Sequence, residues 1–278
     1  MARLTVPPNF IGTPSSDTLI GEQLNVSSAI GIDILTGGLI YTLSGKDTIK
    51  GTGAASIDNL NQGGNGTGIA NSGSLNTEDG KDVIAGTGTG GNSGDVDSGN
   101  GAEGGIGTGI ANSGILNAGD GKDAIVGTGK GGNGGTDTDT VSFDSNGGNG
   151  ETGTGIANNR GSINLGDGND TITGIGIGGN GGSRGYVKGV DIGVGGTGTG
   201  ISNSGSLNAG DGKDTITGTG KGGNGGGVLA GGAEGGIGTI PLKVPTSLLI
   251  TMETPLALLP LGLKNLSLQI ALSATVLW

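Results

Sequence analysis

The chain has 278 residues, of which 71 are glycine and only five are aromatic, and it contains neither cysteine nor histidine. This composition excludes a conventional globular core, because glycine adds no side chain and loses the most backbone entropy on folding. The net charge of −11 argues against nucleic acid and anionic membranes as partners. The lack of Cys and His excludes disulfides, thiolate metal sites and a histidine general base.

Residues 1–51 are predicted to form degenerate N-terminal repeats or a cap. The segments SSDTLIG, GIDILTG and GKDTIKG place Asp17, Asp33 and Asp47 two residues before an aliphatic residue. Their spacings of 16 and 14 residues are shorter than the period found later in the chain. The first ten residues, MARLTVPPNF, lack the apolar stretch that is typical of a secretory signal.

Residues 52–239 contain four repeats of a phrase that begins TGIAN or TGISN. Its first and last isoleucines, Ile69 and Ile201, are 132 residues apart over three intervals, which gives a mean period of 44. Each repeat has a fixed part and a glycine-rich variable part. Constant cores with insertions at one place predict stacked coils with loops on one face.

The fixed part alternates with the period of a β-strand, and the absence of a 3.6-residue stripe argues against helix. We expect two short strands joined by a turn, within an all-β, parallel β-solenoid with Gly-rich loops. Because a coil commonly has about 20 residues, a repeat of this length predicts two coils. Two inward isoleucine ladders are expected, and an inward or turn ladder of asparagines. Their members are Ile69, Ile110, Ile156 and Ile201; Ile84, Ile125, Ile172 and Ile216; and Asn71, Asn112, Asn158 and Asn203.

The composition changes abruptly at Ile240. Only one glycine, Gly262, lies beyond this point, and residues 240–278 are rich in leucine but interrupted by four prolines. The repeat phrase matches through Thr239, skips one expected glycine and is then lost. We therefore expect an apolar, non-repeat tail that does not span a membrane and arose by a shift of reading frame near Thr239. A genuine apolar cap on the solenoid is the alternative.

The repeated segment LNAGDGKDTITGTG contains a motif that resembles a known family. Residues 209–217, AGDGKDTIT, match the nonapeptide GGxGxDxUx of bacterial RTX-like calcium-binding repeat proteins at Gly210, Gly212, Asp214 and Ile216. Two further copies match closely, and the first is weaker because Glu78 replaces a glycine. The resemblance therefore marks these candidate metal-site residues: Asp82, Gly119, Gly121, Asp123, Gly166, Gly168, Asp170, Gly210, Gly212 and Asp214.

The resemblance implies that calcium is bound by these turns. Calcium takes six to eight oxygen ligands, and glycines allow a sharp turn that directs carbonyl groups at the ion while Asp adds a carboxylate. In the family, nonapeptides come in tandem and each ion sits between neighbouring turns. Here they are about 44 residues apart. With two coils per repeat, the neighbouring coil would contribute GIANSGSLN, which has no carboxylate.

A structural role for the same aspartates remains open. An Asp side chain can accept hydrogen bonds from backbone N–H groups and hold a bend. Lys81, Lys122 and Lys213 each precede one of these aspartates and would partly neutralise an exposed acidic patch. The GGNGG runs also resemble the glycine-rich PGRS segments of mycobacterial proteins, which implies polyglycine-II-like packing.

The expected function is that of a non-enzymatic, secreted or cell-surface repeat protein with a structural or adhesive role. The resemblance implies calcium as its ion and export by a type I-like route. We also expect an extracellular matrix or surface polysaccharide as partner. The alternatives are a calcium-independent structural β-solenoid and the repeat region of a polysaccharide-active extracellular enzyme. The alternating Thr215, Thr217 and Thr219 also suggest the flat threonine array that orders water on ice-binding solenoids.

Overall fold

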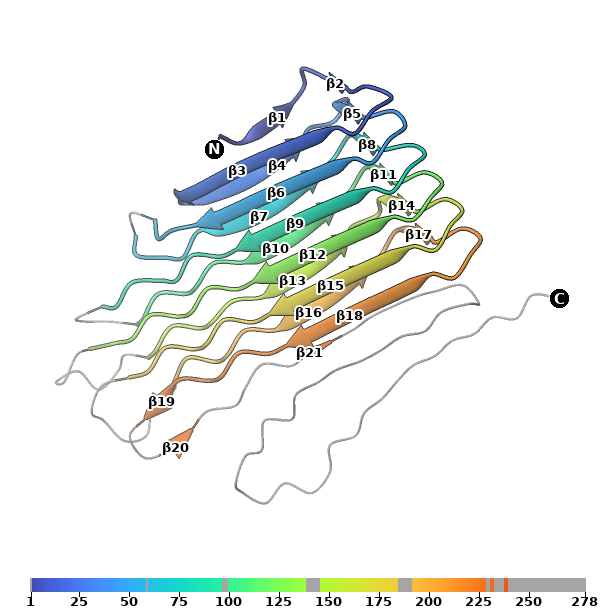
Figure 1. Ribbon diagram of the computed structural model, residues 1–278. Coiled ribbons are helices and arrows are strands. Elements are labelled where there is room, and N and C mark those ends of the chain that lie inside the picture. The colour runs from blue at the N-terminus through green and yellow to red at the C-terminus, as the bar shows by residue number, and fades with distance from the viewer. Residues whose placement is uncertain are drawn as a thin grey trace.

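The computed structural model describes residues 2–58, 60–96, 100–138, 146–184, 192–228, 231–232 and 238–239. Within these residues the chain is an all-β solenoid without helices, built from three parallel sheets that we call A, B and C. Figure 1 shows sheet C at the front, sheet A behind it and the short strands of sheet B at one end of both. The β-solenoid predicted from the alternating repeats is confirmed.

Each coil of the solenoid contributes one strand to each sheet. Sheet A contains β1 (Leu4–Val6), β4 (Ser28–Ile34), β7 (Asn65–Asn71), β10 (Gly107–Asn112), β13 (Gly153–Asn158), β16 (Gly198–Asn203) and β21 (Gly238–Thr239). Sheet B contains β2 (Phe10–Ile11), β5 (Leu39–Tyr41), β8 (Ser74–Asn76), β11 (Ile115–Asn117), β14 (Ser162–Asn164) and β17 (Ser206–Asn208). Sheet C contains β3 (Thr18–Val26), β6 (Thr48–Ala55), β9 (Val83–Thr89), β12 (Ala124–Lys130), β15 (Thr171–Ile177) and β18 (Thr215–Lys221). A separate antiparallel pair joins β19 (Gly227–Val228) and β20 (Gly231–Gly232).

The expectation of two coils per repeat is wrong, because each repeat forms one coil. Ile110 pairs directly with Ile69 on one side and with Ile156 on the other. The fixed phrase supplies three strands rather than two: the chain bends between β16 and β17, so that the predicted first strand divides between sheets A and B. The glycine-rich segment completes the same coil instead of forming a second one.

The N-terminal residues form two full coils, β1–β3 and β4–β6, in register with the repeats. Asp17 and Asp47 occupy equivalent turns 30 residues apart, since the N–H of Asp17 donates to the Asp47 carboxylate. Asp33 is different. It lies in β4, pairs with Thr5 and Ala70 in sheet A, and forms an ion pair with Arg3.

The core consists of aliphatic ladders that run along the solenoid axis. The two isoleucine ladders predicted from the sequence are confirmed, because their members pair in register and are at most 1 % exposed. A third ladder comes from sheet B, where Leu75, Leu116 and Ile163 are fully buried. Fully burying one such side chain contributes about 1.5–3 kcal/mol, so these ladders supply much of the cohesion in a glycine-rich chain.

Beyond the isoleucines, sheets A and C approach each other so closely that only glycine fits between them. A Cβ atom added to Gly127 of β12 would lie 2.2 Å from the carbonyl oxygen of Gly155 in β13, and 2.5 Å from Cγ1 of Ile156. A Cβ on Gly155 would lie 2.3 Å from the backbone nitrogen of Ile175. These contacts explain why the fixed phrase has glycine two places after the isoleucine of sheet C.

The glycine-rich half of each coil consists of extended segments bonded by their backbones. Successive donors are three residues apart: the N–H groups of Gly90, Ser93 and Val96 donate to the next coil in the same layer. The N–H groups of Gly91 and Gly94 donate instead to the opposite layer. A three-residue repeat without hydrogen bonds inside a segment is the geometry of a polyproline-II-type helix. This pattern matches the polyglycine-II-like packing implied by the GGNGG runs, and Figure 1 shows these segments as parallel traces.

The repeat continues in register through its last described residues. In β21, Gly238 and Thr239 pair with Gly198 and Thr199 of β16, as the repeat phrase predicts. The predicted apolar tail, residues 240–278, lies outside the described residues, so the reading-frame hypothesis stays a prediction. Among the described residues there is no helix of the length and hydropathy needed to cross a membrane.

Candidate functional site: a buried aspartate ladder

The motif turns of all coils form one stack at the end of the solenoid that carries sheet B. Each turn leads from a strand of sheet B into a strand of sheet C. Parallel bridges connect the glycine two places before each motif aspartate with its equivalent in the next coil. They join Gly45, Gly80, Gly121, Gly168 and Gly212 in order. The expectation that GIANSGSLN is the neighbour of each motif turn is therefore wrong, since every turn lies next to another motif turn.

The motif aspartates form a continuous ladder through this stack. In each step the backbone N–H of one aspartate donates to Oδ1 of the equivalent aspartate in the following coil. The donor-to-Oδ1 distances are 2.8 Å for Asp17 to Asp47, 2.7 Å for Asp47 to Asp82, 2.8 Å for Asp82 to Asp123, 2.7 Å for Asp123 to Asp170 and 3.0 Å for Asp170 to Asp214. One carboxylate oxygen of each aspartate therefore holds the coils together.

The glycines of the motif are required by this geometry. Gly119 has a φ of 85° and Gly210 a φ of 76°, which lie in the left-handed region that side chains disfavour. In the weaker first copy, Glu78 occupies the same position with a φ of 55°. Asn76 supports it, because its side-chain amide donates to Oε1 of Glu78 at 2.6 Å. The glycine two places before each aspartate allows the turns to stack closely, since a Cβ on Gly80 would lie 1.8 Å from the carbonyl oxygen of Gly45 in the adjacent turn and 3.0 Å from Oδ1 of Asp82.

In four members of the ladder the second carboxylate oxygen has no hydrogen-bond partner. Oδ2 of four aspartates is fully buried without a hydrogen bond, and these residues are at most 2 % exposed. The four are Asp47, Asp82, Asp123 and Asp170. Burying a carboxylate without a partner is costly, so each Oδ2 requires a proton or a cation.

Burial also changes the acidity of the ladder. Desolvation, with a smaller contribution from the charges of Asp82 and Asp170, raises the pKa of Asp123 to about 7, although the hydrogen bond from the Asp82 backbone lowers it. Desolvation raises the pKa of Asp82 to about 6, with a smaller contribution from Asp47. The pKa of Asp170 is raised for the same first reason. Two unit charges about 5 Å apart repel by roughly 3 kcal/mol at an effective dielectric constant of 20. The ladder therefore favours either proton uptake or cation binding near neutral pH.

Lys81, Lys122 and Lys213 do not lie beside the aspartates they precede. The three lysines are exposed, while Asp82 and Asp123 are buried between the sheets. The predicted mutual neutralisation in an exposed patch is therefore wrong. Each lysine is separated from the aspartate that follows it because successive side chains of an extended chain point to opposite faces. A separate row of exposed aspartates, Asp120, Asp167 and Asp211, lies outside the ladder on the same turns.

The structure adds two members that were not among the predicted site residues. Asp17 and Asp47 belong to the same ladder as Asp82, and the sequence signal was the segment GKDTIKG. The predicted asparagine ladder is confirmed next to it. Side-chain amides join Asn71, Asn112, Asn158 and Asn203 at 2.7–2.8 Å.

The chemistry available at this site depends on backbone as well as side-chain oxygens. Within the described part of the chain, no cluster of three or more His, Cys, Asp or Glu side chains could hold a metal ion by itself. An ion bound at the ladder would need backbone carbonyl groups of the turns as additional ligands, which calcium accepts. Comparison with protein-family models, curated proteins and solved structures gave no match for this chain.

Proposed function

We propose that the protein is a non-enzymatic structural element of the cell surface or extracellular space, stiffened by calcium bound along its aspartate ladder. The observation that carries this proposal is the set of four buried Oδ2 atoms without a partner. A divalent cation would neutralise two neighbouring carboxylates and so remove both the desolvation cost and their mutual repulsion. The resemblance of the turns to RTX-like nonapeptides supports calcium as this cation.

The stacking of the turns strengthens the calcium proposal. In the RTX family each ion sits between neighbouring turns, and here each motif turn has another motif turn on either side within the stack. The stack supplies carboxylates from Asp47 to Asp214, and backbone carbonyl groups of the turns would have to complete the shell. Six to eight oxygens are required for calcium, and a carboxylate pair with several carbonyl groups satisfies that number.

A calcium-independent structural solenoid is the second candidate function. It is supported by the Oδ1 atoms, each of which already accepts a backbone N–H from the adjacent coil. In that case the pKa of Asp123, about 7, means that this carboxyl group is partly protonated at neutral pH without calcium. Both candidates keep the solenoid as a structural rod, and they differ only in what neutralises Oδ2.

Calcium titration of the metal-free protein by isothermal calorimetry at pH 7.5 tests the proposal. The decisive variant replaces Asp82, Asp123 and Asp170 with Asn, which keeps the Oδ1 acceptor and removes the charge. The matched control replaces the exposed Asp120, Asp167 and Asp211 with Asn, which removes the same charge from the exposed row of the stack. We expect calcium binding in the wild type and the control, and at least a roughly ten-fold loss of affinity in the ladder variant.

Two results would decide against calcium at the ladder. Absence of calcium binding by the wild type favours the calcium-independent solenoid. Loss of binding in the exposed-row control, with full binding in the ladder variant, moves the site to the outside of the turns. Circular dichroism of each variant shows whether the solenoid is still folded.

A further inference from the structure

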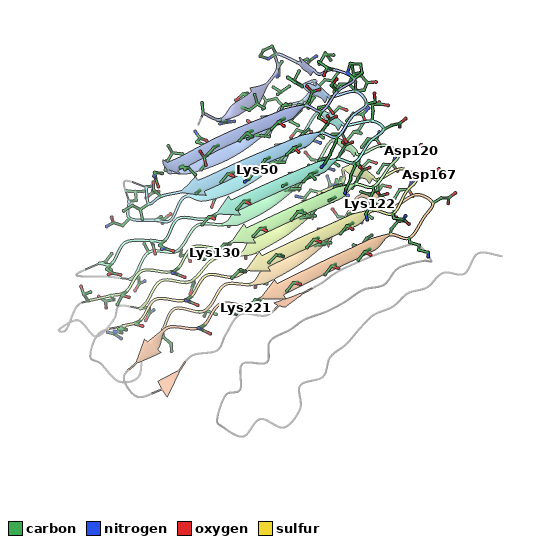
Figure 2. The ribbon with its side chains drawn as sticks, in the orientation of Figure 1. Lys50, Asp120, Lys122, Lys130, Asp167 and Lys221 are labelled. Atoms are coloured by element: carbon green, nitrogen blue, oxygen red, sulfur yellow. The ribbon has the colours of Figure 1, made fainter. Side chains whose placement is uncertain are left out.

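The seven lysines that the structure describes lie either on the strands of sheet C or on the turns that lead into those strands. The same alternation that buries each motif aspartate turns the residue before it outward. The lysines are Lys46, Lys50, Lys81, Lys122, Lys130, Lys213 and Lys221, and all are exposed. Figure 2 shows Lys50, Lys130 and Lys221 over the strands of sheet C, with Asp120 and Asp167 at the turns beyond its edge. We call the outward face of sheet C, together with these lysines, the lysine face.

The outward positions of β6, β9, β12, β15 and β18 carry no acidic side chain, although the chain has a net charge of −11. The exposed Asp120, Asp167 and Asp211 lie on the turns before these strands. Between the lysines the lysine face presents threonine hydroxyls in register across neighbouring strands. One row contains Thr52, Thr87, Thr128 and Thr219, interrupted only by Ile175. Threonine occupies ten of the twenty outward positions of these five strands, and the rest are Ala, Val, Ile and Lys. The face is therefore polar, flat and positively charged.

The ammonium groups of this face are available to a ligand. Within the described part of the chain, no ion pair joins any of the seven lysines to a carboxylate. The lysine pair at either end of β12, Lys122 and Lys130, is separated by eight residues, or about 26 Å along the strand. Five strands at about 4.8 Å spacing give the face a width of about 20 Å. Lysine ammonium groups therefore lie at the edges of a surface that presents threonine hydroxyl groups.

We propose that the lysine face binds an acidic polysaccharide, one that carries carboxylate or sulfate groups along an extended chain. Lysines supply the charge complementarity, and the threonine rows can exchange hydrogen bonds with sugar hydroxyls. This site is distinct from the aspartate ladder, which lies inside the solenoid and has the opposite charge.

Other polyanions and ordered water fit the face less well. The five strands carry no aromatic side chain on which a nucleic-acid base could stack, and no arginine to bind phosphates bidentately. They present no protruding row of large apolar side chains for insertion into a membrane surface. Outward Ala, Val and Ile side chains also interrupt the continuous threonine array that an ice-binding surface requires. The face therefore fits a hydroxyl-rich polyanion best.

The test measures binding of the full chain to immobilised polygalacturonate and dextran sulfate, with neutral dextran as the blank. The buffer contains a calcium chelator, so that calcium cannot bridge protein and polymer and the outcome is independent of the calcium proposal. The lysine-face variant replaces Lys122, Lys130 and Lys213 with Gln. The matched control replaces the exposed Asn92, Asn180 and Asn224 on the glycine-rich half with Asp, which changes the net charge by the same amount. A third variant replaces the three lysines with Arg.

We expect the wild type and the Asn control to bind both acidic polymers, with an affinity that falls as salt rises. The Gln variant should lose at least roughly ten-fold in affinity for both acidic polymers. The Arg variant should keep the affinity of the wild type. Tighter binding to single-stranded DNA or to vesicles of anionic lipid than to either polysaccharide would overturn the proposal. So would equal binding by the Gln variant and the wild type, or no binding above neutral dextran.

Discussion

The turn-side half of each coil buries side chains, whereas the glycine-rich half buries backbone. On the turn side, Ile125 and Asp123 are at most 2 % exposed, and side-chain ladders of isoleucine, asparagine and aspartate run along the axis. In the other half, Gly132 donates its N–H to Gly105 in the opposite layer and no side chain separates the two layers. A Cβ on Gly132 would lie 1.9 Å from the carbonyl oxygen of Gly91.

The comparison shows two ways in which a repetitive sequence can form a compact structure. Side-chain ladders place identical groups above one another, so apolar ladders stabilise the stack while charged ladders require a counter-charge. Backbone packing needs no complementary side chains, but it excludes every side chain larger than a hydrogen atom at its contacts. The two halves should therefore respond differently to substitution and to pH.

The largest effect should come from opening a cavity on the turn side. Changing Ile125 to Ala removes a fully buried side chain from the middle of its ladder, and we expect a loss of about 2–5 kcal/mol in the free energy of unfolding. Ile115 to Ala is the matched control, because Ile115 is 55 % exposed. Urea unfolding measures both. Equal losses in the two variants would contradict the inward ladder.

The aspartate ladder should make the calcium-free protein less stable as pH rises. The pKa of Asp82 is about 6 and that of Asp123 about 7, compared with about 3.9 in an unfolded chain. Between these values the folded state binds more protons than the unfolded state, so the free energy of unfolding falls from about pH 4 to pH 7.

Thermal unfolding with a chelator present measures this pH dependence. We expect the midpoint to be several degrees lower at pH 8 than at pH 5. The variant with Asn at both positions should show a flatter profile. Rising stability across this pH window would be inconsistent with buried carboxylates.

A smaller effect is expected in the glycine-rich half. Gly131 to Ala forces a Cβ to within 1.8 Å of the carbonyl oxygen of Glu151 in the opposite layer, and we expect a loss of about 1–3 kcal/mol from this overpacking. Gly94 to Ala should change the stability by less than about 0.5 kcal/mol, because its Cβ would meet only the side chain of Asn61 at 3.3 Å. The same urea assay separates the two. If both glycines tolerate Ala equally, the layers are not in close contact.

The smallest effect should be a gain. Glu78 holds a positive φ where the other strong repeats have glycine, so Glu78 to Gly should stabilise the protein by roughly 0.5–1 kcal/mol. The gain is limited because the hydrogen bond from Asn76 is lost. Glu103 to Gly, at a position without a positive φ, is expected to give no gain. A loss of stability in the Glu78 variant would show that its side chain matters more than its backbone strain.

Much of the fold could be predicted because the repeats alternate. The equal spacing of Ile69, Ile110 and their equivalents predicts a stack, and alternation predicts which side chains face inward. The number of coils per repeat could not be obtained in this way. Glycine-rich segments carry no alternation of side chains, so their place in the same coil depends on backbone contacts such as the hydrogen bond from Gly132 to Gly105.

The site was predicted in part. The motif identified Asp82, Asp123, Asp170 and Asp214, but the spacing of 44 residues suggested that they were isolated from one another. Only the register of neighbouring coils brings them into one ladder. The lysine face was missed for a related reason: a net charge averages over the molecule, whereas alternation within the segment GKD sends Lys122 outward and Asp123 inward.

The most direct test of the account is a carboxyl-carbon NMR titration of the chain labelled at aspartate, with and without calcium. In calcium-free protein we expect Asp123 to titrate with a pKa of about 7 and Asp82 with a pKa of about 6. Saturating calcium should displace those protons and keep both carboxylates ionised down to about pH 5. Titration of every aspartate near pH 4 in the calcium-free protein, or titration curves that calcium leaves unchanged, would contradict a buried ladder that binds calcium.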